Sequence, residues 1–413
     1  MDNKLLHRRS LLTGGAALAS WALSSARPAP GKGWLEDEGE DDGRNLVLVQ
    51  LTGGNDGLNT VVPYADDVYY RERPSTAVAE NKVLKLDDYR GLHPDLKRLR
   101  ALFDDEKVAI VEGVGYPNQG RSHFKSLEIW HTAHPRGRVV SDGWIGRMCQ
   151  AAWPAVDNSE LVVHVGSGAP FSVHSESHPP VMIASPTSYR WFGDSSKAAA
   201  WRKAGAGDGA ERPANGDTSR RAVLSRLRRV LDVADTSSVR VRRAASEYEP
   251  TATYPKQTFA ANLRDIAAFI HGGLGTRVFS CELTGFDTHA KQATQHNGLM
   301  RTLDEGLGAF MEDLSGSSLG RDTLVVVFSE FGRRVAENES AGHDHGHAGP
   351  VLVLGQAVKG GLHGRHPSME ELDQGDLTFT TDFRSVYASV IEDWFGLDSE
   401  PMLFGRYPKL ALL

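Results

Sequence analysis

Residues 46–51 read Leu-Val-Leu-Val-Gln-Leu, and residues 52–57 continue as Thr-Gly-Gly-Asn-Asp-Gly. A short apolar run of this kind is typical of a strand that is buried on both faces of a sheet. The glycines that follow allow the backbone to turn tightly where the strand ends. A buried strand that leads into a glycine-rich loop is the usual start of an α/β sheet.

Similar apolar runs recur along the rest of the chain, at 108–111, 161–163, 278–281, 324–328 and 351–354. Between several of these runs lie segments whose apolar residues fall at three- and four-residue spacing, notably 259–271 and 298–314. Such spacing predicts amphipathic helices. Strands that alternate with helices predict a largely parallel sheet that is covered by helices on both faces.

Composition and charge exclude several classes of protein. A chain of 413 residues with 40% hydrophobic and 24% charged residues is neither disordered nor a small disulfide scaffold. The net charge of −7, without a dense basic patch after the N-terminus, argues against a nucleic-acid partner. The two cysteines, Cys149 and Cys281, fit no zinc-binding spacing. They are one disulfide or two buried thiols, and we favour the thiols.

The N-terminal segment resembles an export signal. Residues 1–26 contain Arg8-Arg9, then an apolar stretch from Leu11 to Ala22, then the small residues 24–26. This pattern predicts a twin-arginine signal peptide, with an ordinary secretory signal as the alternative, and implies the twin-arginine translocase as a partner during export. No later run reaches the length of about 18 apolar residues that a membrane helix needs. We therefore expect a periplasmic or secreted protein that is not an integral membrane protein.

Two polar stretches mark the limits of the folded region. Residues 36–42 hold six carboxylates in seven positions, so we interpret 27–44 as an acidic, solvated linker. Residues 194–220 lack any apolar period and are expected to form a flexible insertion. The remaining chain, 45–413, is expected to be one large domain that contains this insertion.

Polar residues that follow the predicted strands are candidates for a functional site, because ligands bind at the carboxyl ends of strands in an open α/β sheet. Carboxylate and imidazole groups that arrive from several strand ends are what a divalent metal site requires. Each residue alone also has an ordinary explanation as a helix cap, a turn residue or a solvated side chain. Together they predict a centre for zinc, manganese, calcium or magnesium, with the candidate ligands Asp56, Asp287, His289, Glu330, His345 and His347.

A candidate nucleophile lies at Ser122, where the chain enters a predicted helix at 124–131. A hydroxyl at a helix N-terminus lies among backbone N–H groups that favour an anion. Arg121, the preceding residue, is able to bind oxyanion oxygens. The alternative is that Ser122 only caps the helix, since serine is a favoured N-cap residue.

Taken together, the motifs resemble the bacterial exported family called domain of unknown function 1501, which is itself similar to the alkaline phosphatase and sulfatase superfamily. They run in one order across roughly residues 45–400: 51–64, Arg121-Ser122-His123-Phe124 with Trp130, Gly143-Trp144-Ile145-Gly146-Arg147, Phe286-Asp287-Thr288-His289, Ser329-Glu330-Phe331-Gly332-Arg333 with Asn338, Asp344-His345-Gly346, and Thr381-Asp382-Phe383-Arg384. The resemblance implies an alkaline-phosphatase-like three-layer sandwich, with a mixed, mostly parallel sheet flanked by helices.

The resemblance also implies a function. The chain resembles enzymes in which a divalent metal assists the hydrolysis of phosphate or sulfate esters, and the ester is carried by a small molecule or a polysaccharide. The nucleophile would be Ser122 or a metal-bound water, and Arg121 or Arg333 would stabilise the developing charge. Phe331 stands where the superfamily has a metal-binding histidine, so one of its usual two metals is expected to be lost or bound differently. The alternative is a non-catalytic exported binding or assembly protein with a partial metal site.

Overall fold

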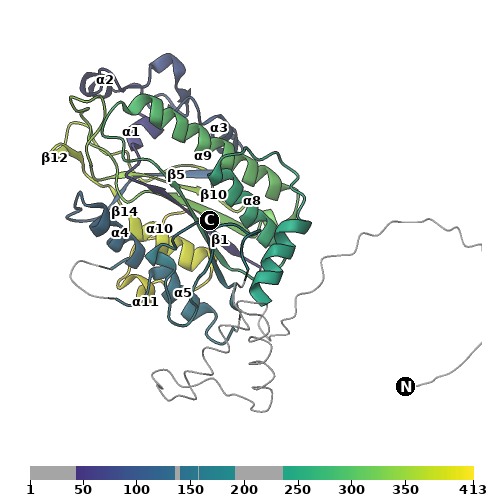
Figure 1. Cartoon of the computed structure of the whole chain (residues 1–413). Helices are drawn as coiled ribbons and strands as arrows, with labels where there is room; N and C mark the ends of the chain where they lie inside the picture. Colours follow the sequence, from purple (N-terminus) through teal and green to yellow (C-terminus); the bar gives the residue numbers. More distant parts are fainter. Residues whose placement is uncertain (1–42, 135–139, 157, 191–235) are drawn as a thin grey trace, which may run out of the picture. The chain divides into compact units, whose positions relative to one another are not determined.

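A computed structural model describes residues 43–134, 140–156, 158–190 and 236–413 (Figure 1). The predicted signal peptide at 1–26, the predicted acidic linker at 27–44 except for its last two residues, and the predicted insertion at 194–220 lie outside the described residues. None of the described helices is long and apolar enough to cross a membrane.

The fold is built on a nine-stranded sheet with strand order β11-β5-β10-β9-β1-β8-β6-β7, in which β14 also pairs with β5. Its strands are β1 (Asn45–Thr52), β5 (Val108–Gly115), β6 (Val162–Val165), β7 (Val181–Ile183), β8 (Val278–Thr284), β9 (Thr323–Phe328), β10 (Gly349–Leu354), β11 (Gly361–His363) and β14 (Thr381–Asp382). Strand β1 lies parallel to both β8 and β9, whereas β10 is antiparallel to β9 and β5. The predicted mixed, mostly parallel sheet is confirmed.

Alternating side chains of β1 serve two hydrophobic cores. Val47 and Val49 pack into one core together with residues of the helices α3 (Lys97–Asp104), α8 (Thr258–His271) and α9 (Gln292–Ser315). Leu46 and Leu48 point to the opposite face and pack into the other core. That second core contains the helices α4 (His123–Thr132), α5 (Trp144–Ala152), α10 (Phe383–Ser389) and α11 (Glu400–Leu403), with the π-helical turn η4 (Val390–Trp394).

Figure 1 shows these two sets of helices on opposite sides of the sheet, which gives the three layers. The predicted helix at 259–271 is confirmed as α8, while α9 begins six residues before the predicted 298. Residues 292–297 carry no apolar period that would have marked this first part of α9. Cys149 and Cys281 are both free and buried, as two separate thiols.

Shorter elements surround the sheet. A three-stranded sheet contains β2 (Val61–Val62), β4 (Gly91–Leu92) and β3 (Leu84–Lys85), and a hairpin pairs β12 (Leu372–Asp373) with β13 (Asp376–Leu377). The remaining short helices are α1 (Gly57–Thr60), α2 (Asp67–Glu72), η1 (Glu80–Lys82), η2 (Phe171–Val173) and η3 (Ser318–Gly320).

The parallel strands β1, β8 and β9 bring three loops together at one edge of the sheet. Gly53, in the loop after β1, has φ of +123°, a conformation that a residue with a Cβ rarely adopts. A Cβ there would also collide with the backbone nitrogen of Asp287, in the loop after β8. A glycine at this position therefore allows the first loop to lie directly against the loop that carries Asp287.

Candidate metal centre

Three predicted ligands meet at this edge of the sheet. His289 Nε2 lies 3.0 Å from Asp287 Oδ1 and 2.9 Å from His345 Nε2. His345 Nε2 lies 3.0 Å from the same oxygen of Asp287. Two nitrogen donors and one carboxylate oxygen thus form a triangle with sides of about 3 Å, built from the loop after β8 and the loop before β10.

A fourth side chain, His123, joins this group, although it is not among the ligands predicted from the sequence. His123 is the first residue of α4, and its Nε2 lies 3.6 Å from Asp287 Oδ2. Donor atoms of His123, Asp287 and His345 all lie within 4.8 Å of one another. Helix α4 therefore supplies a histidine to a group whose other members come from the loops at the strand ends.

Each of the three histidines is held through its Nδ1 atom. Nδ1 of His123 lies 2.8 Å from Glu330 Oε1, Nδ1 of His345 lies 2.8 Å from the carbonyl oxygen of Arg121, and Nδ1 of His289 lies 3.2 Å from Asp344 Oδ1. Ionised carboxylates and carbonyl oxygens only accept hydrogen bonds, so Nδ1 is the donor in each ring. In each neutral imidazole the lone pair is then on Nε2, the atom that faces Asp287. Histidines that bind metals are usually held in this way.

Asp287 is kept ionised by its neighbours. Burial alone would raise its pKa, but the hydrogen bond from Arg333 and the charge of that guanidinium, with the neighbouring histidines, lower it to about 2. Arg333 Nη2 donates to Asp287 Oδ1 at 2.8 Å. The carboxylate is therefore an anionic donor over the whole physiological pH range.

Arg333, predicted to stabilise developing charge, is fully buried and has its guanidinium engaged. Its Nε donates to the carbonyl oxygen of Gly54 at 2.7 Å, and its Nη1 donates to that of His343 at 2.8 Å. Its Nη2 also donates to the carbonyl oxygens of Gly53 and Phe286. Arg333 thus ties the loops after β1 and β8 to the loop before β10, and it holds Asp287 in place.

Glu330, predicted as a metal ligand, is fully buried and contacts His123 instead of pointing directly into the triangle. Its Oε1 also accepts a hydrogen bond from the backbone N–H of Gly53 at 2.9 Å, and its Oε2 accepts one from Ser329 Oγ at 3.1 Å. The hydrogen bond to Glu330 is the main cause of a raised pKa at His123. Protons therefore compete with a metal ion for this histidine at acidic pH.

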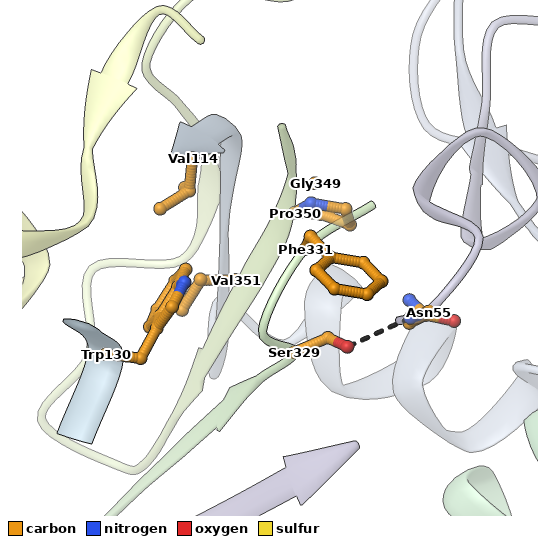
Figure 2. A pocket seen from close by; sticks show the side chains of 8 residues that line it. All are labelled: Asn55, Val114, Trp130, Ser329, Phe331, Gly349, Pro350 and Val351. Atoms are coloured by element: carbon orange, nitrogen blue, oxygen red, sulfur yellow. Dashed lines mark hydrogen bonds between the residues drawn. The ribbon is translucent and has the colours of Figure 1, made fainter. Parts of the chain in front are cut away.

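The apolar ring of Phe331 packs against His123 and His345. Its ring centroid lies 4.9 Å from that of His123 and 4.7 Å from that of His345. Gly54 leaves room for this ring, because a Cβ at that position would collide with it. Figure 2 shows Phe331 beside a small pocket that is otherwise lined by Asn55, Val114, Trp130, Ser329, Gly349, Pro350 and Val351. This lining includes no titratable side chain, in contrast to the histidine group.

Asp56, predicted as a ligand from the first strand, has a different partner. It is fully buried, and its Oδ2 lies 2.7 Å from Arg73 Nη1 and 2.5 Å from Gln292 Nε2. Burial alone would raise its pKa, but the charge and hydrogen bond of Arg73, together with the nearby His343 and His296, outweigh burial and hold the pKa well below the ordinary value. The negative charge of Asp56 is thus balanced by an internal guanidinium.

Arg121 and His347 also contact a different carboxylate, that of Asp376 on β13. Arg121 donates to Asp376 Oδ2 from Nε at 2.8 Å and from Nη2 at 2.6 Å. His347 Nε2 lies 3.2 Å from the same oxygen. The backbone carbonyl of Arg121 reaches the metal group through His345, while its guanidinium is anchored to the β12–β13 hairpin.

Ser122 immediately precedes His123 at the start of α4. Its side chain is exposed and makes no capping hydrogen bond to the described helix. The capping explanation for this serine is thus not supported by the geometry. Phe124, two residues further along the chain, is 88% exposed. The start of α4 therefore presents a hydroxyl group and an aromatic ring to solvent beside His123.

The residues fit a single divalent ion. An ion that binds its donors at about 2.0–2.3 Å requires them to be less than about 4.6 Å apart. The sides of the triangle, and the 3.6 Å between His123 Nε2 and Asp287 Oδ2, satisfy this limit. Asp287 and His289 side chains are 49% and 44% exposed, so an ion and a substrate have access from solvent. We call His123, Asp287, His289 and His345 the metal group.

A mixed α/β protein with a His/Asp group at the carboxyl ends of its parallel strands is thus defined. The chain belongs to the family described as protein of unknown function, DUF1501, whose profile matches residues 112–403. The predicted family resemblance is confirmed. All four residues of the metal group lie inside the matched range, whereas Asp56 and Arg73 lie outside it. None of the curated proteins matches the sequence significantly.

Several solved structures are similar to this chain. A protein in the alkaline phosphatase superfamily from Vibrio parahaemolyticus has 11% identity and a TM-score of 0.38, with 88% of this chain and 69% of that chain covered. A phosphonate monoester hydrolase from Silicibacter pomeroyi has 11% identity and a TM-score of 0.36, with coverage of 88% and 75%. The soluble domain of lipooligosaccharide phosphoethanolamine transferase A from Neisseria meningitidis has 12% identity and a TM-score of 0.38, with coverage of 88% and 94%. Likeness at this level does not define an activity, so the chemistry has to come from the residues of the metal group.

Proposed function

We propose that this chain is a metal-dependent hydrolase of phosphate or sulfate esters, and that its ion is held by the metal group. One observation carries the proposal: three histidines, each held through Nδ1, direct their Nε2 atoms toward one ionised aspartate. An assembly of like donor atoms at this distance is costly without a cation between them, and several hydrogen bonds maintain it here. A structural role alone would not require all three rings to share one orientation.

The donor set favours zinc among the four candidate ions. Imidazole nitrogens suit zinc and related transition ions, whereas calcium and magnesium prefer oxygen donors. The metal group offers one carboxylate and three imidazoles. A bound divalent ion would supply Lewis acidity to an ester oxygen.

The residues around the ion suggest how the chain contributes to hydrolysis. The first turn of α4 has backbone N–H groups without helical partners, and these favour the negative charge of a phosphate or sulfate group. The exposed hydroxyl of Ser122, or a water molecule beside it, attacks the phosphorus or sulfur atom. The proton of the attacking hydroxyl or water passes to the ester oxygen, which leaves as an alcohol. Where Ser122 attacks, a water molecule then hydrolyses the serine ester, which releases phosphate or sulfate and restores the hydroxyl. Arg333 contributes by holding Asp287, since its own N–H groups are already engaged.

The metal group is accessible to solvent, and this exposure places little limit on the size of the substrate. Asp287 and His289 are close to half exposed, and Phe124 stands free in solvent next to the start of α4. An ester group on a small molecule or on a polysaccharide chain could therefore reach the ion. We also propose that the chain is exported by the twin-arginine translocase to the periplasm or the cell exterior, and that 45–413 forms one domain. Mass spectrometry of the exported protein should find cleavage near residue 26.

The test combines metal analysis with an ester panel. Purified protein is expected to contain about one zinc per chain and to release product from at least one aryl phosphate or aryl sulfate. Ser122→Ala should remove this activity without unfolding the protein, while Ser246→Ala, which changes another exposed serine, should not. A metal-loaded protein that hydrolyses none of a broad set of esters would contradict the hydrolase proposal.

A second candidate function is that of a non-catalytic binding or assembly protein with one structural ion. The observation in its favour is that Asp56 and Arg121 are both committed to internal ion pairs, with Arg73 and Asp376. Asp56 is fully buried in this arrangement, and Nε and Nη2 of Arg121 both donate to Asp376. Stoichiometric metal without any ester turnover is the outcome that favours this second function.

A further inference from the structure

Glu330 and His123 form a carboxylate–imidazole pair at the base of the metal group. The carboxylate is completely buried, and its Oε1 lies 2.8 Å from His123 Nδ1. The same carboxylate accepts hydrogen bonds from the backbone of Gly53 and from the hydroxyl of Ser329. Both oxygens of Glu330 are therefore engaged by donors from three different segments of the chain.

We infer that Glu330 is a positioning residue, which aims His123 at the ion as a fourth protein ligand and does not itself bind the ion. This inference rests on the proposed metal centre. The ring of His123 is 29% exposed, and it touches Phe331 and His345 only through ring contacts at 4.9 Å and 4.4 Å. These contacts do not distinguish Nδ1 from Nε2. The hydrogen bond to Glu330 does, because it fixes Nδ1 as the donor and leaves the lone pair on Nε2.

The three groups that accept a hydrogen bond from Nδ1 of a histidine in the metal group are not equivalent. His345 is held by a backbone carbonyl, which cannot be removed by substitution, and His289 is held by Asp344, which is 54% exposed. Glu330 is the buried carboxylate among them. A hydrogen bond from an imidazole to a buried carboxylate is stronger than one at the surface, because water does not compete for it. Glu330 should accordingly have the larger effect on the orientation of its histidine.

The competing assignment is that Glu330 binds the ion directly, as its position after β9 suggested from the sequence. Direct binding through Oε1 would require Glu330 to give up its hydrogen bond with His123 or with Gly53, because that oxygen already accepts from both. The backbone N–H of Gly53 is buried, and it would be left without this acceptor if Glu330 moved away from it. The positioning role needs no such rearrangement, since Glu330 and His123 already have the geometry of a carboxylate–histidine–metal arrangement.

The chain contains a matched control for this pair. Glu112, on β5, is also buried, and its Oε1 lies 2.9 Å from Nδ1 of His366. This second pair is not part of the metal group. Glu112→Gln should therefore reproduce the general effect of changing a buried carboxylate that holds a histidine, without changing a metal ligand or its support.

The experiment measures the zinc dissociation constant of the full chain by competition with a chromophoric chelator, together with the visible absorption of the Co²⁺-loaded protein. The variants are Glu330→Ala, Glu330→Gln, His123→Ala and the double variant Glu330→Ala/His123→Ala. Glu330→Ala is expected to weaken zinc binding about 10- to 100-fold and to change the Co²⁺ spectrum. Glu330→Gln keeps an oxygen that accepts from His123 Nδ1, so it should weaken binding less than Glu330→Ala and serves as the variant that is expected to fold normally.

The double variant separates positioning from direct binding. If Glu330 acts through His123, the change Glu330→Ala should weaken zinc binding by less than about 3-fold once His123 is already alanine. If the two effects multiply instead, Glu330 binds the ion independently and the inference is wrong. The inference also fails if Glu330→Ala leaves zinc affinity unchanged, or if Glu112→Gln lowers it as much. Wild-type protein that binds no divalent ion would overturn the proposed metal centre itself, which is a different result from these.

Discussion

Two strand-end aspartates at the same edge of the sheet have opposite surroundings. Asp56, after β1, is fully buried and is paired with the buried guanidinium of Arg73. Asp287, after β8, is 49% exposed and has histidine nitrogens at 3.0 Å, in addition to Arg333. Asp287 is a metal-ligand candidate because its neighbours include lone-pair donors and because solvent reaches it. At Asp56 the buried guanidinium of Arg73 stands where Asp287 has histidine nitrogens and solvent.

The largest expected effect is on zinc affinity, and it distinguishes the residues around Asp287 from Asp56. His345→Ala should weaken zinc binding about 100-fold or more, because it removes a nitrogen donor from the centre of the metal group. Asp56→Asn should leave the dissociation constant within about 2-fold of the wild-type value. Chelator competition on both variants checks this. Equal losses in the two variants would show that Asp56 also contributes to the metal site.

The second difference concerns stability in the absence of metal. Asp56→Ala leaves the charge of Arg73 buried without its partner, so we expect a loss of about 3–5 kcal/mol in the free energy of unfolding. Asp287→Ala should cost less, because its half-exposed side chain leaves Arg333 with four backbone carbonyl partners. Urea unfolding in the presence of a chelator measures both. A larger loss in the free energy of unfolding for Asp287→Ala than for Asp56→Ala would contradict this expectation.

A smaller effect should appear in the pH dependence of stability near Asp56. Burial lowers the pKa of His296, whose Nε2 lies 3.2 Å from Asn55 Oδ1, to about 3. Because this value is below that of the unfolded chain, the unfolded state binds the proton more readily between about pH 6.5 and 3. The contribution of a neutral His296 is complete above that window and is lost as the pH falls through it.

The variant His296→Gln isolates this contribution. Between about pH 5.5 and 4, the stability of wild-type protein relative to this variant should fall by about 1.4 kcal/mol per pH unit. The measurement is urea unfolding at several pH values with a chelator present. Parallel stability curves for the two proteins would contradict a neutral, buried His296.

The smallest expected effect is that of Ser122→Ala on stability. Ser122 is exposed and makes no capping bond to the described part of α4, so its replacement should change the free energy of unfolding by less than about 0.5 kcal/mol. The thermal unfolding midpoint of the metal-free variant provides the check. A loss of about 1 kcal/mol or more would assign Ser122 to helix capping, and it would weaken its candidacy as the nucleophile.

The sequence predicted the sheet better than it predicted the contacts within the site. Buried strands produce continuous apolar runs, so β1, β5, β8, β9 and β10 were visible from composition and spacing. Asp287, His289 and His345 were identified because they stand next to such runs. The start of α9 was missed, since residues 292–297 have no apolar period.

The remaining differences arise from partners that are distant in the sequence. Arg73 follows α2 and contacts Asp56 from a segment with no periodic pattern. No residue close to Asp56 in the sequence therefore indicates that its negative charge is balanced by a guanidinium. His123 stood within the Arg-Ser-His-Phe motif, and its place at the start of a helix was the signal that could have identified it. The orientation of Glu330 toward His123 is accompanied by hydrogen bonds from Gly53 and Ser329, and a linear pattern does not encode these contacts.

The comparison between Asp56 and Asp287 is tested most directly by locating the ion. Crystals of the full chain grown with zinc would be measured by anomalous diffraction on both sides of the zinc absorption edge. We predict one strong anomalous peak in contact with His123, Asp287, His289 and His345, and no peak beside Asp56. A peak at Asp56, or the absence of any peak at the metal group in zinc-saturated crystals, would contradict the account.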